Sequence, residues 1–368
     1  MANTTVSYKC PHCTAPLSFQ PGKETVSCEY CGTEFEVAAI KALFDREQER
    51  AALAAEAEET QWDTADAGTE WTAEESEHLK KFTCSSCGAE LLCDENTMAT
   101  ECCYCGNPTM IPSRFDGALM PDYVIPFKKT KQEAVAALKE FYKGKTLLPA
   151  AFTKDNRVED IQPMYVPFWL FDSKISSRAS FRAETDHIYE TGNERIKETK
   201  VYACERAGKM SFGRIPVDGS KKMDDSYMES IEPFDYSALE PFNAGYLAGY
   251  LADRYDVGAE ESAPRADRRI VNTAAGVLQD TVTGYQRVSM ENHVVSKEEG
   301  KVIYAMAPVW ILTTRYEGKP YTFMMNGQTG KMVGHLPYDK VKSWVYPGGI
   351  ALILLPVLYY MAKIVSTM

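Results

Sequence analysis

The sequence of 368 residues lacks the motifs of several common protein classes. It contains no GxxxxGK[ST] loop and no other glycine-rich phosphate cradle, which argues against a nucleotide-driven enzyme. Its first residues carry neither a basic region nor an apolar run, so no cleavable signal peptide is expected. A hydrophobic content of 45% and an aromatic content of 11% nevertheless predict a globular chain with a core, in two or three folded units.

Basic side chains are scarce along one stretch of the chain. Residues 45–77 contain twelve acidic residues and only two arginines, which accounts for −10 of the formal net charge of −12. Alanine-rich sequence with apolar residues at helical spacing predicts a helix over 36–60. The acidic, threonine-rich residues 61–80 predict a flexible linker, in which Trp62 and Trp71 stand isolated.

Eight of the eleven cysteines form two quartets with identical spacing, offset by 74 residues. Two CxxC pairs at this separation predict a tetrahedral site for one structural zinc ion in each quartet. The alternative is disulfides or buried free thiols, but two copies with the same spacing favour zinc. Zinc thiolates need reducing conditions, so we expect these ribbons to face the cytosol. The predicted metal ligands are Cys10, Cys13, Cys28 and Cys31 in the first ribbon, and Cys84, Cys87, Cys102 and Cys105 in the second. Cys93, Cys103 and Cys204 lie outside the quartets and have no predicted role.

The ribbons, expected at 1–35 and 81–112, lack the charge of a nucleic-acid reader. Residues 82–107 contain no lysine or arginine at all. Phosphate contacts supply most of the affinity for nucleic acid, so the composition argues against binding of DNA or RNA by these ribbons. The alternative functions are a protein-docking module and a self-contained structural element.

Residues 113–340 predict an α+β domain with two related repeats. The apolar run at 164–171 recurs at 304–312, with Pro167 matched to Pro308 and Trp169 to Trp310. A predicted helix precedes each run, at 131–143 and at 264–280, and a further strand follows each, at 177–184 and at 321–325. We therefore expect each repeat to be a helix packed on its own small antiparallel sheet.

Several local signals support these elements. Thr130 followed by Glu133 is a capping box at the start of the first helix. Glu317-Gly318 and Asn326-Gly327 are hairpin turn signals. The segment 128–145 carries a net charge of +4, which fits a solvated helix face or a surface that meets lipid headgroups or the acidic linker.

The segment 220–255 is rich in acidic and aromatic residues and is the basis of an enzymatic alternative. Asp224 and Asp225 in a cleft can act in acid–base chemistry. No histidine, nucleophilic serine or glycine-rich phosphate loop is near them in the sequence. Helix capping explains the two aspartates at least as well.

The chain ends in an uncharged segment, 344–362, which spans nineteen residues. As a helix it would be about 28 Å long, enough to cross a bilayer. With no signal peptide, this predicts a C-terminal transmembrane tail anchor, with the N-terminal bulk of the chain in the cytoplasm. A buried core helix is the alternative.

Several of these motifs together resemble a known family. They are the ribbons, the Val-Pro-Phe-Trp strand, the segment 222–236 and the run 326–330. They resemble bacterial membrane-anchored proteins with transcription-factor-B-type zinc ribbons, whose members are often labelled primosomal protein N′ or replication-restart helicase. The resemblance implies the eight cysteine ligands named above and a scaffold role at the membrane, near phage-shock-type or flotillin-like proteins. The missing nucleotide loop argues against the helicase label.

The fold expected from the sequence is thus α+β. Two small four-cysteine zinc ribbons are separated by the acidic helix and linker at 36–80, and the duplicated domain and the transmembrane helix follow. The expected function is that of a non-enzymatic membrane adaptor or scaffold that recruits protein partners. A zinc-ribbon protein that binds nucleic acid in replication or transcription, and an enzyme that uses residues 220–255, are the alternatives.

Overall fold

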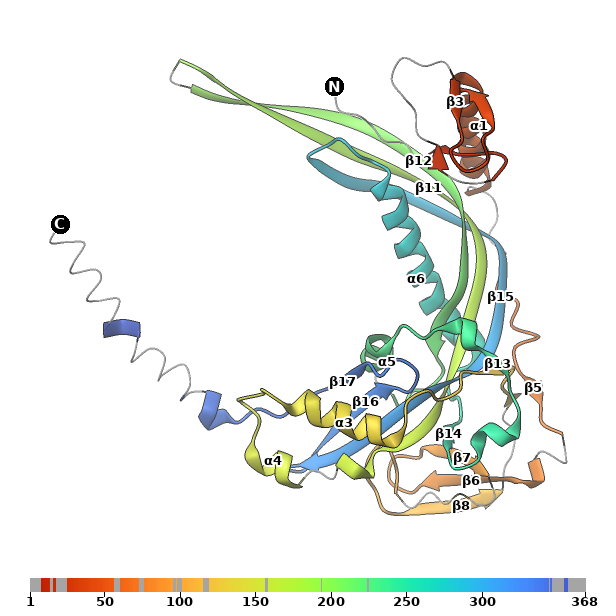
Figure 1. Ribbon diagram of the computed structural model, residues 1–368, viewed down its shortest axis with the longest axis vertical. Coiled ribbons are helices and arrows are strands. Elements are labelled where there is room, and N and C mark those ends of the chain that lie inside the picture. Colours follow the sequence, from red (N-terminus) through yellow and green to blue (C-terminus); the bar gives the residue numbers. More distant parts are fainter. Residues whose placement is uncertain are drawn as a thin grey trace. The chain divides into compact units, whose positions relative to one another are not determined.

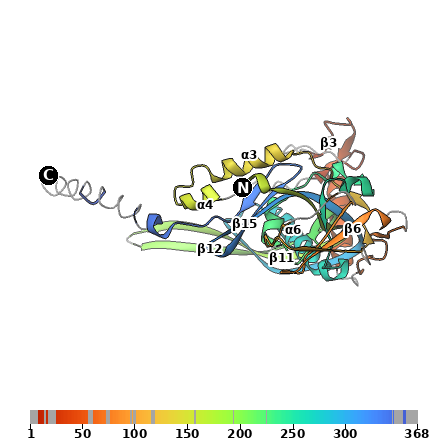
Figure 2. The ribbon, with the colours of Figure 1, turned by 90° about the horizontal axis from the view of Figure 1, so that it is seen from below.

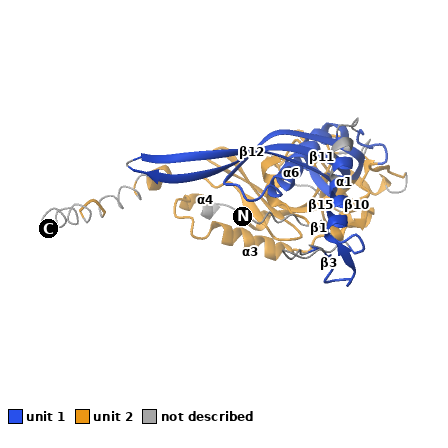
Figure 3. Cartoon of the chain, turned by 90° about the horizontal axis from the view of Figure 1, so that it is seen from above, with its two compact units in different colours: residues 1–66, 169–217, 259–303 blue, residues 67–168, 218–258, 304–368 orange. Residues whose placement is uncertain are grey.

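The chain folds into two compact units, each assembled from separate stretches of sequence (Figure 3). Unit 1 comprises 1–66, 169–217 and 259–303, and unit 2 comprises 67–168, 218–258 and 304–368. The structure is a computed structural model, and it describes residues 8–13, 16–17, 25–55, 60–72, 76–94, 97, 101–114, 119–155, 158–192, 194–223, 225–343, 345 and 354–356.

Two very long strands contribute to both units. Strands β11 (Gln162–Thr191) and β15 (Arg287–Tyr316) each have 30 residues and are neighbours in one mixed sheet. The two apolar runs that repeat in the sequence lie in these strands and are almost wholly buried. Strands covered on both faces read as continuous apolar runs, which explains why neither run alternates with polar residues.

Unit 1 contains the outer part of β11, its hairpin partner β12 (Glu194–Asp218), the first part of β15 and helix α6 (Ala259–Asp280). The hairpin of β11 and β12 is a long two-stranded ribbon (Figure 1). The buried residues of α6 recur every three or four positions, so they form one face of the helix. Ile270 packs against Ile175 of β11, and Leu278 packs against Phe181 further along the same strand.

Unit 2 contains helix α3 (Lys131–Tyr142), the second part of β15, and strands β16 (Lys319–Asn326) and β17 (Met332–Gly334). The predicted capping box is present: the Thr130 hydroxyl accepts from the Glu133 backbone, and Glu133 Oε2 accepts from the Thr130 backbone N–H at 2.8 Å. Helix α3 lies on the outside of unit 2 (Figures 1 and 2). It buries Leu138 and Tyr142 in a cluster with Phe323 of β16.

The predicted duplication is wrong in how its parts are packed. The helix of the first repeat, α3, packs on β15 and β16 of the second repeat. The helix of the second repeat, α6, packs on β11 and β12 of the first. Because β11 and β15 belong to a single sheet of eleven strands in the described part of the chain, the repeats share their sheet and exchange helices. The predicted pair of separate antiparallel sheets is therefore not formed, and β10 (Tyr123–Val124) and β14 (Leu251–Asp253) add parallel pairs.

The remaining elements are short. The Glu317-Gly318 turn is confirmed as a two-residue hairpin loop between β15 and β16, and both residues have positive φ. Asn326-Gly327 instead begins a longer loop before β17, closed by the Asn326 N–H that donates to the Lys331 carbonyl. Further elements of unit 2 are β5 (Thr69–Glu70), β9 (Leu119–Met120), α4 (Ala150–Asp155), η1 (Val158–Asp160), α5 (Asp225–Ile231), η2 (Tyr236–Ala238), β13 (Glu240–Pro241) and η3 (Ala244–Leu247).

The linker expected to be flexible has two anchored tryptophans. Trp62 belongs to unit 1, where its indole N–H donates to Asp267 at 3.0 Å and the Lys297 ammonium lies 4.1 Å from the ring centroid. Gly300 makes room for this ring, because a Cβ there would come within 2.8 Å of it. Trp71 belongs to unit 2 and makes an edge contact with Phe242. The residues between the ribbons are thus fixed at both of these points.

The predicted transmembrane anchor is contradicted. Among the helices in the described residues, none combines the length and the apolarity that a membrane span requires. Most of 344–362 lies outside the described residues. Within this run the structure describes 345 and the helical residues 354–356, far fewer than the roughly 20 residues that a span requires. The predicted membrane location rested on this helix and is contradicted with it.

Candidate metal centres

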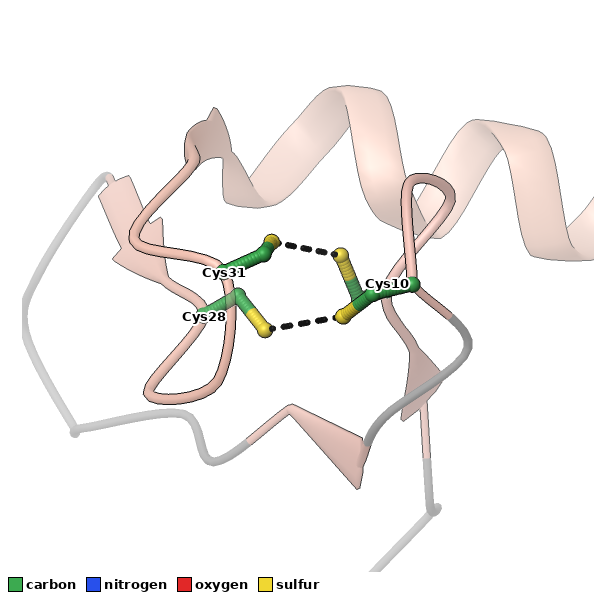
Figure 4. A group of neighbouring side chains, drawn as sticks. Cys10, Cys28 and Cys31 are labelled. Carbon is green, nitrogen blue, oxygen red and sulfur yellow. Dashed lines mark hydrogen bonds between the residues drawn. The ribbon is translucent and has the colours of Figure 1, made fainter.

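The first cysteine quartet is held by two short hairpins in unit 1, β1 (Tyr8–Lys9) with β2 (Pro16–Leu17) and β3 (Thr25–Ser27) with β4 (Glu34–Glu36). Cys10 Sγ lies 3.6 Å from Cys31 Sγ, and Cys13 Sγ lies 3.5 Å from Cys28 Sγ. The sulfurs of the labelled cysteines face a common centre (Figure 4). Helix α1 (Val37–Ala55) follows β4 and closes a small core with Ile40.

The second quartet repeats this geometry in unit 2. Cys84 Sγ lies 3.6 Å from Cys105 Sγ, and Cys87 Sγ lies 3.6 Å from Cys102 Sγ. Its strands are β6 (Leu79–Cys84), β7 (Glu90–Asp94) and β8 (Met110–Arg114). They belong to the large sheet, because β7 pairs with β14, which in turn pairs with β11.

The sulfur spacing fits a tetrahedral metal ion. In each quartet the four sulfurs lie within 4.8 Å of one another. A zinc–sulfur bond of about 2.3 Å implies a sulfur–sulfur edge of about 3.8 Å in a regular tetrahedron. Disulfide sulfurs would be about 2.05 Å apart, whereas the sulfur pairs described above lie 3.5 to 3.6 Å apart, so the quartets do not form disulfides. Both quartets can hold a metal ion.

The backbone of each second knuckle is the same in the two ribbons. In the first, the Cys28 N–H donates to the Thr33 carbonyl and the Gly32 N–H donates to the Cys28 carbonyl, both at 2.9 Å. In the second, Cys102 and Gly106 make the same two bonds at 2.8 Å, to Asn107 and Cys102. Gly32 and Gly106 have φ of 71° and 65°, the left-handed conformation that favours glycine.

Hydrogen bonds favour the thiolate form at two ligand positions. The side chain and backbone of Thr33 lower the pKa of Cys31 to about 6. Burial acts against ionisation at Cys84, but the backbone N–H groups of Cys87 and Ser86 bring its pKa to about 7. A thiolate is the form that binds a metal ion. At two other ligands of the second site, Cys87 and Cys102, burial raises the pKa instead.

The cysteines outside the quartets have different surroundings. Cys103 lies beside the second site, but its sulfur contacts the Met164 sulfur at 3.5 Å. Burial raises the pKa of Cys103 well above its usual range and raises that of Cys93 to about 11. Cys204 is buried near the Tyr285 hydroxyl in unit 1. Buried protonated thiols such as Cys93 and Cys103 act as small apolar residues.

The second ribbon is fastened to the rest of unit 2 by polar contacts that sequence reasoning did not find. Thr313 Oγ1 donates to the Cys103 carbonyl at 2.7 Å, and Arg315 donates from Nε and Nη2 to the Cys105 carbonyl at 3.2 and 3.1 Å. Lys222 Nζ donates to the Cys87 carbonyl at 3.2 Å. The nearest cysteine ligand is more than a hundred residues away in the chain in each case, so local patterns carry no signal for these contacts.

A buried carboxyl lies behind the same ribbon. Asp253 of β14 is 1% exposed, and burial raises its pKa to about 7, although Ser220 and Tyr104 beside it lower that pKa. The Tyr104 hydroxyl is buried, and burial with Asp253 nearby raises its pKa well above the usual range. A cavity of about 290 Å³ lined by Asp253, Lys222 and Arg254 adjoins this region.

The enzymatic alternative was based on Asp224 and Asp225 of the acidic segment. Asp224 lies outside the described residues, and Asp225 is exposed in the first turn of α5. The Tyr227 hydroxyl is hydrogen-bonded to His335, on the surface. The segment is instead fastened to the loop after β16, where the fully buried Asn326 donates to the carbonyls of Ile231 and Pro233.

The chain was also compared with known proteins. No protein-family model matches it. No solved structure matches it either. It is 33% identical over 348 residues to the uncharacterized protein YdjG of Bacillus subtilis (strain 168), and the match covers 94% of each chain. At this identity over nearly the full length of both, the chain belongs to the same family as YdjG.

Proposed function

We propose that this protein is a non-enzymatic adaptor whose two four-cysteine sites each hold a structural zinc ion. The second ribbon is built into the large sheet, and the first is the module that binds partner proteins. The observation that carries this is the contrast between the two ribbons. Their metal geometry is the same, but only the second adds strands to the large sheet.

The chemistry of the donor sets supports a structural ion. Four cysteine ligands leave no open position for water or substrate, so an ion held there organises the fold and activates nothing. Zinc suits four thiolates in a tetrahedron because it imposes no other geometry. A ribbon held by metal is a small rigid surface, and it folds without a large core of its own.

Charge supports a protein partner over nucleic acid. Residues 82–107 of the second ribbon contain no lysine or arginine, although Lys80 and Lys81 of β6 and Arg114 of β8 flank them, and the first ribbon has two lysines against three glutamates. Four thiolates on a divalent ion add about two negative charges at each site. A surface of this sign is repelled by phosphate, so the affinity that nucleic-acid binding requires is missing.

The adaptor function is tested by comparing the full chain with its Cys31→Ser variant. Each is purified from its native host after mild cross-linking, and the bound proteins are identified. Loss of the first metal should release a defined set of proteins, while Cys204→Ser, outside both quartets, should release none. An unchanged set of bound proteins in Cys31→Ser, with one metal ion lost, would refute the proposal.

A further inference from the structure

The two ribbons differ most at the tip of the second knuckle. In the second ribbon, Cys103 is 5% exposed and Tyr104 is half-buried. In the first ribbon, the matching residues Glu29 and Tyr30 are exposed, and Tyr30 is 75% exposed. The ligand that follows shows the same contrast, because Cys31 is exposed and Cys105 is half-buried. The tip of the second knuckle is thus largely buried in the second ribbon and exposed in the first.

The residues that contact the second knuckle of the second ribbon show which chemical groups such a knuckle binds. Its backbone carbonyls receive hydrogen bonds from the guanidinium of Arg315 and from the hydroxyl of Thr313, and Lys222 donates to the Cys87 carbonyl in the first knuckle of the same ribbon. Its tyrosine enters a polar pocket, with the buried hydroxyl beside Asp253 and Ser220. Carbonyls next to a negatively charged metal–thiolate cluster attract cationic donors, and such charge-assisted bonds are stronger than neutral ones.

Acidic residues lie close in the sequence to the second knuckle of the first ribbon. Glu29 flanks Tyr30 directly, where the second ribbon has Cys103. The ribbon also leads into residues 45–77, with a net charge of −10. Charge complementarity therefore favours a basic partner, because opposite potentials speed association and disfavour partners of the wrong sign.

Resting on the adaptor function above, we propose that the Tyr30 knuckle, residues 28–32, is a docking surface for a basic patch on a partner protein. The partner receives the Tyr30 ring in a pocket that pairs its hydroxyl. It presents arginine or lysine side chains to the carbonyls of the knuckle, as Arg315 does for the matching knuckle of the second ribbon. Tyrosine suits this role, since its ring buries a large area with little loss of conformational freedom.

A second copy of this chain is a poorer occupant than a different protein. The surface in unit 2 that fits such a knuckle is already filled by the chain's own second ribbon. Nucleic acid is a poorer occupant as well, because the ribbon and the residues after it are acidic.

The test places the photo-crosslinker p-benzoylphenylalanine at position 30 of the full chain, expressed in its native host. Tyr338, which is 64% exposed in unit 2, is the matched control position. The cross-linked peptide is identified by mass spectrometry, and the protein it belongs to is purified for binding measurements with the metal-loaded chain. We expect one main adduct at position 30 and not at 338, on a peptide with arginine or lysine nearby.

Binding of the purified pair then measures the contribution of the ring. Tyr30→Ala should weaken the affinity at least about tenfold, as expected for a central aromatic anchor. The affinity of Tyr30→Phe should lie between those of the native chain and Tyr30→Ala, and Tyr338→Ala should leave the affinity unchanged. Raising the salt from about 50 to about 300 mM should weaken binding, because charge contacts are screened.

Three results would overturn the docking surface. They are no adduct at position 30, an adduct with another copy of this chain or with nucleic acid, and an adduct on a peptide without basic residues. If one of these occurs while Cys31→Ser still releases a defined set of proteins, the adaptor function stands and only the assigned surface is wrong. If Cys31→Ser releases nothing, the adaptor function itself fails.

Discussion

At the scale of single residues, the metal sites separate the cysteines into two kinds. Cys102 and Cys103 are adjacent, yet the first faces its three fellow ligands and the second faces Met164. The spacing of the CxxC pairs was sufficient to predict the ligands, because a knuckle places its first and fourth residues on one side. No spacing predicts the partners of Cys103, which come from β11 and β15.

This difference predicts opposite outcomes for neighbouring substitutions. Cys102→Ser should lower the metal content by one ion per chain, since three thiolates hold zinc far less tightly. Cys103→Ser should keep both ions and lose about 1–3 kcal/mol of stability from a buried hydroxyl. Metal content and denaturant unfolding of the two variants measure both effects, and metal loss in Cys103→Ser alone would contradict the ligand assignment.

Asp253 predicts a pH dependence of stability. Its folded pKa, raised to about 7 by burial, lies above the ordinary value for a carboxyl of about 4, so the folded protein holds this proton more tightly. Its contribution to the free energy of unfolding should be present below about pH 4 and be lost as the pH rises through about 7.

The Asp253→Asn variant tests this, because it stays neutral while leaving other titrations in place. The stability of the variant relative to the native protein should rise between about pH 5 and pH 8. Denaturant unfolding of both chains at several pH values measures the difference. A difference that is flat with pH would mean that Asp253 does not titrate in this range.

At the scale of elements, residues 60–63 act as an added edge on β15. Asp63 N–H donates to the Gly300 carbonyl, and the Val302 N–H donates to the Asp63 carbonyl. Composition predicted a flexible linker because acidic segments usually cannot bury enough apolar area to fold. One tryptophan against Phe171 and Lys297 is enough to change that outcome locally.

Trp62→Ala should therefore destabilise unit 1. The loss of a packed indole, with Lys297 left without its ring, should lower the free energy of unfolding by about 3 kcal/mol. Trp62→Phe should retain part of the packing and cost less. Equal stabilities of the native chain and Trp62→Ala would show that the segment is not docked.

The helices of the repeats were predictable, but the separate strand predicted at 177–184 is the continuation of β11, and the pairing of the elements was not predicted. Helical periodicity located α3 and α6, and the matching Pro-Phe-Trp and Pro-Val-Trp runs located β11 and β15. Periodicity tells which face of an element is buried, but any apolar face of suitable size can cover it. The exchange of helices between the repeats is therefore invisible to a pattern that reads each repeat alone.

At the scale of the whole molecule, a membrane span was predicted from the uncharged run 344–362 and the aromatic and basic residues near its ends, and the helices of the described residues do not provide one. The likeness to YdjG extends along 94% of the chain and is not confined to one motif. The metal sites and the different surroundings of the two ribbons are the features that support the proposed function.

The most direct test is the metal content of the intact chain, measured by native mass spectrometry together with elemental analysis. We expect two zinc ions per chain, one of which is lost in Cys31→Ser and the other in Cys105→Ser. In the Cys31→Ser chain the large sheet should stay folded, whereas Cys105→Ser should disturb this sheet, which includes β6 and β7. A native chain with no bound metal, or with metal that both variants retain, would contradict the account.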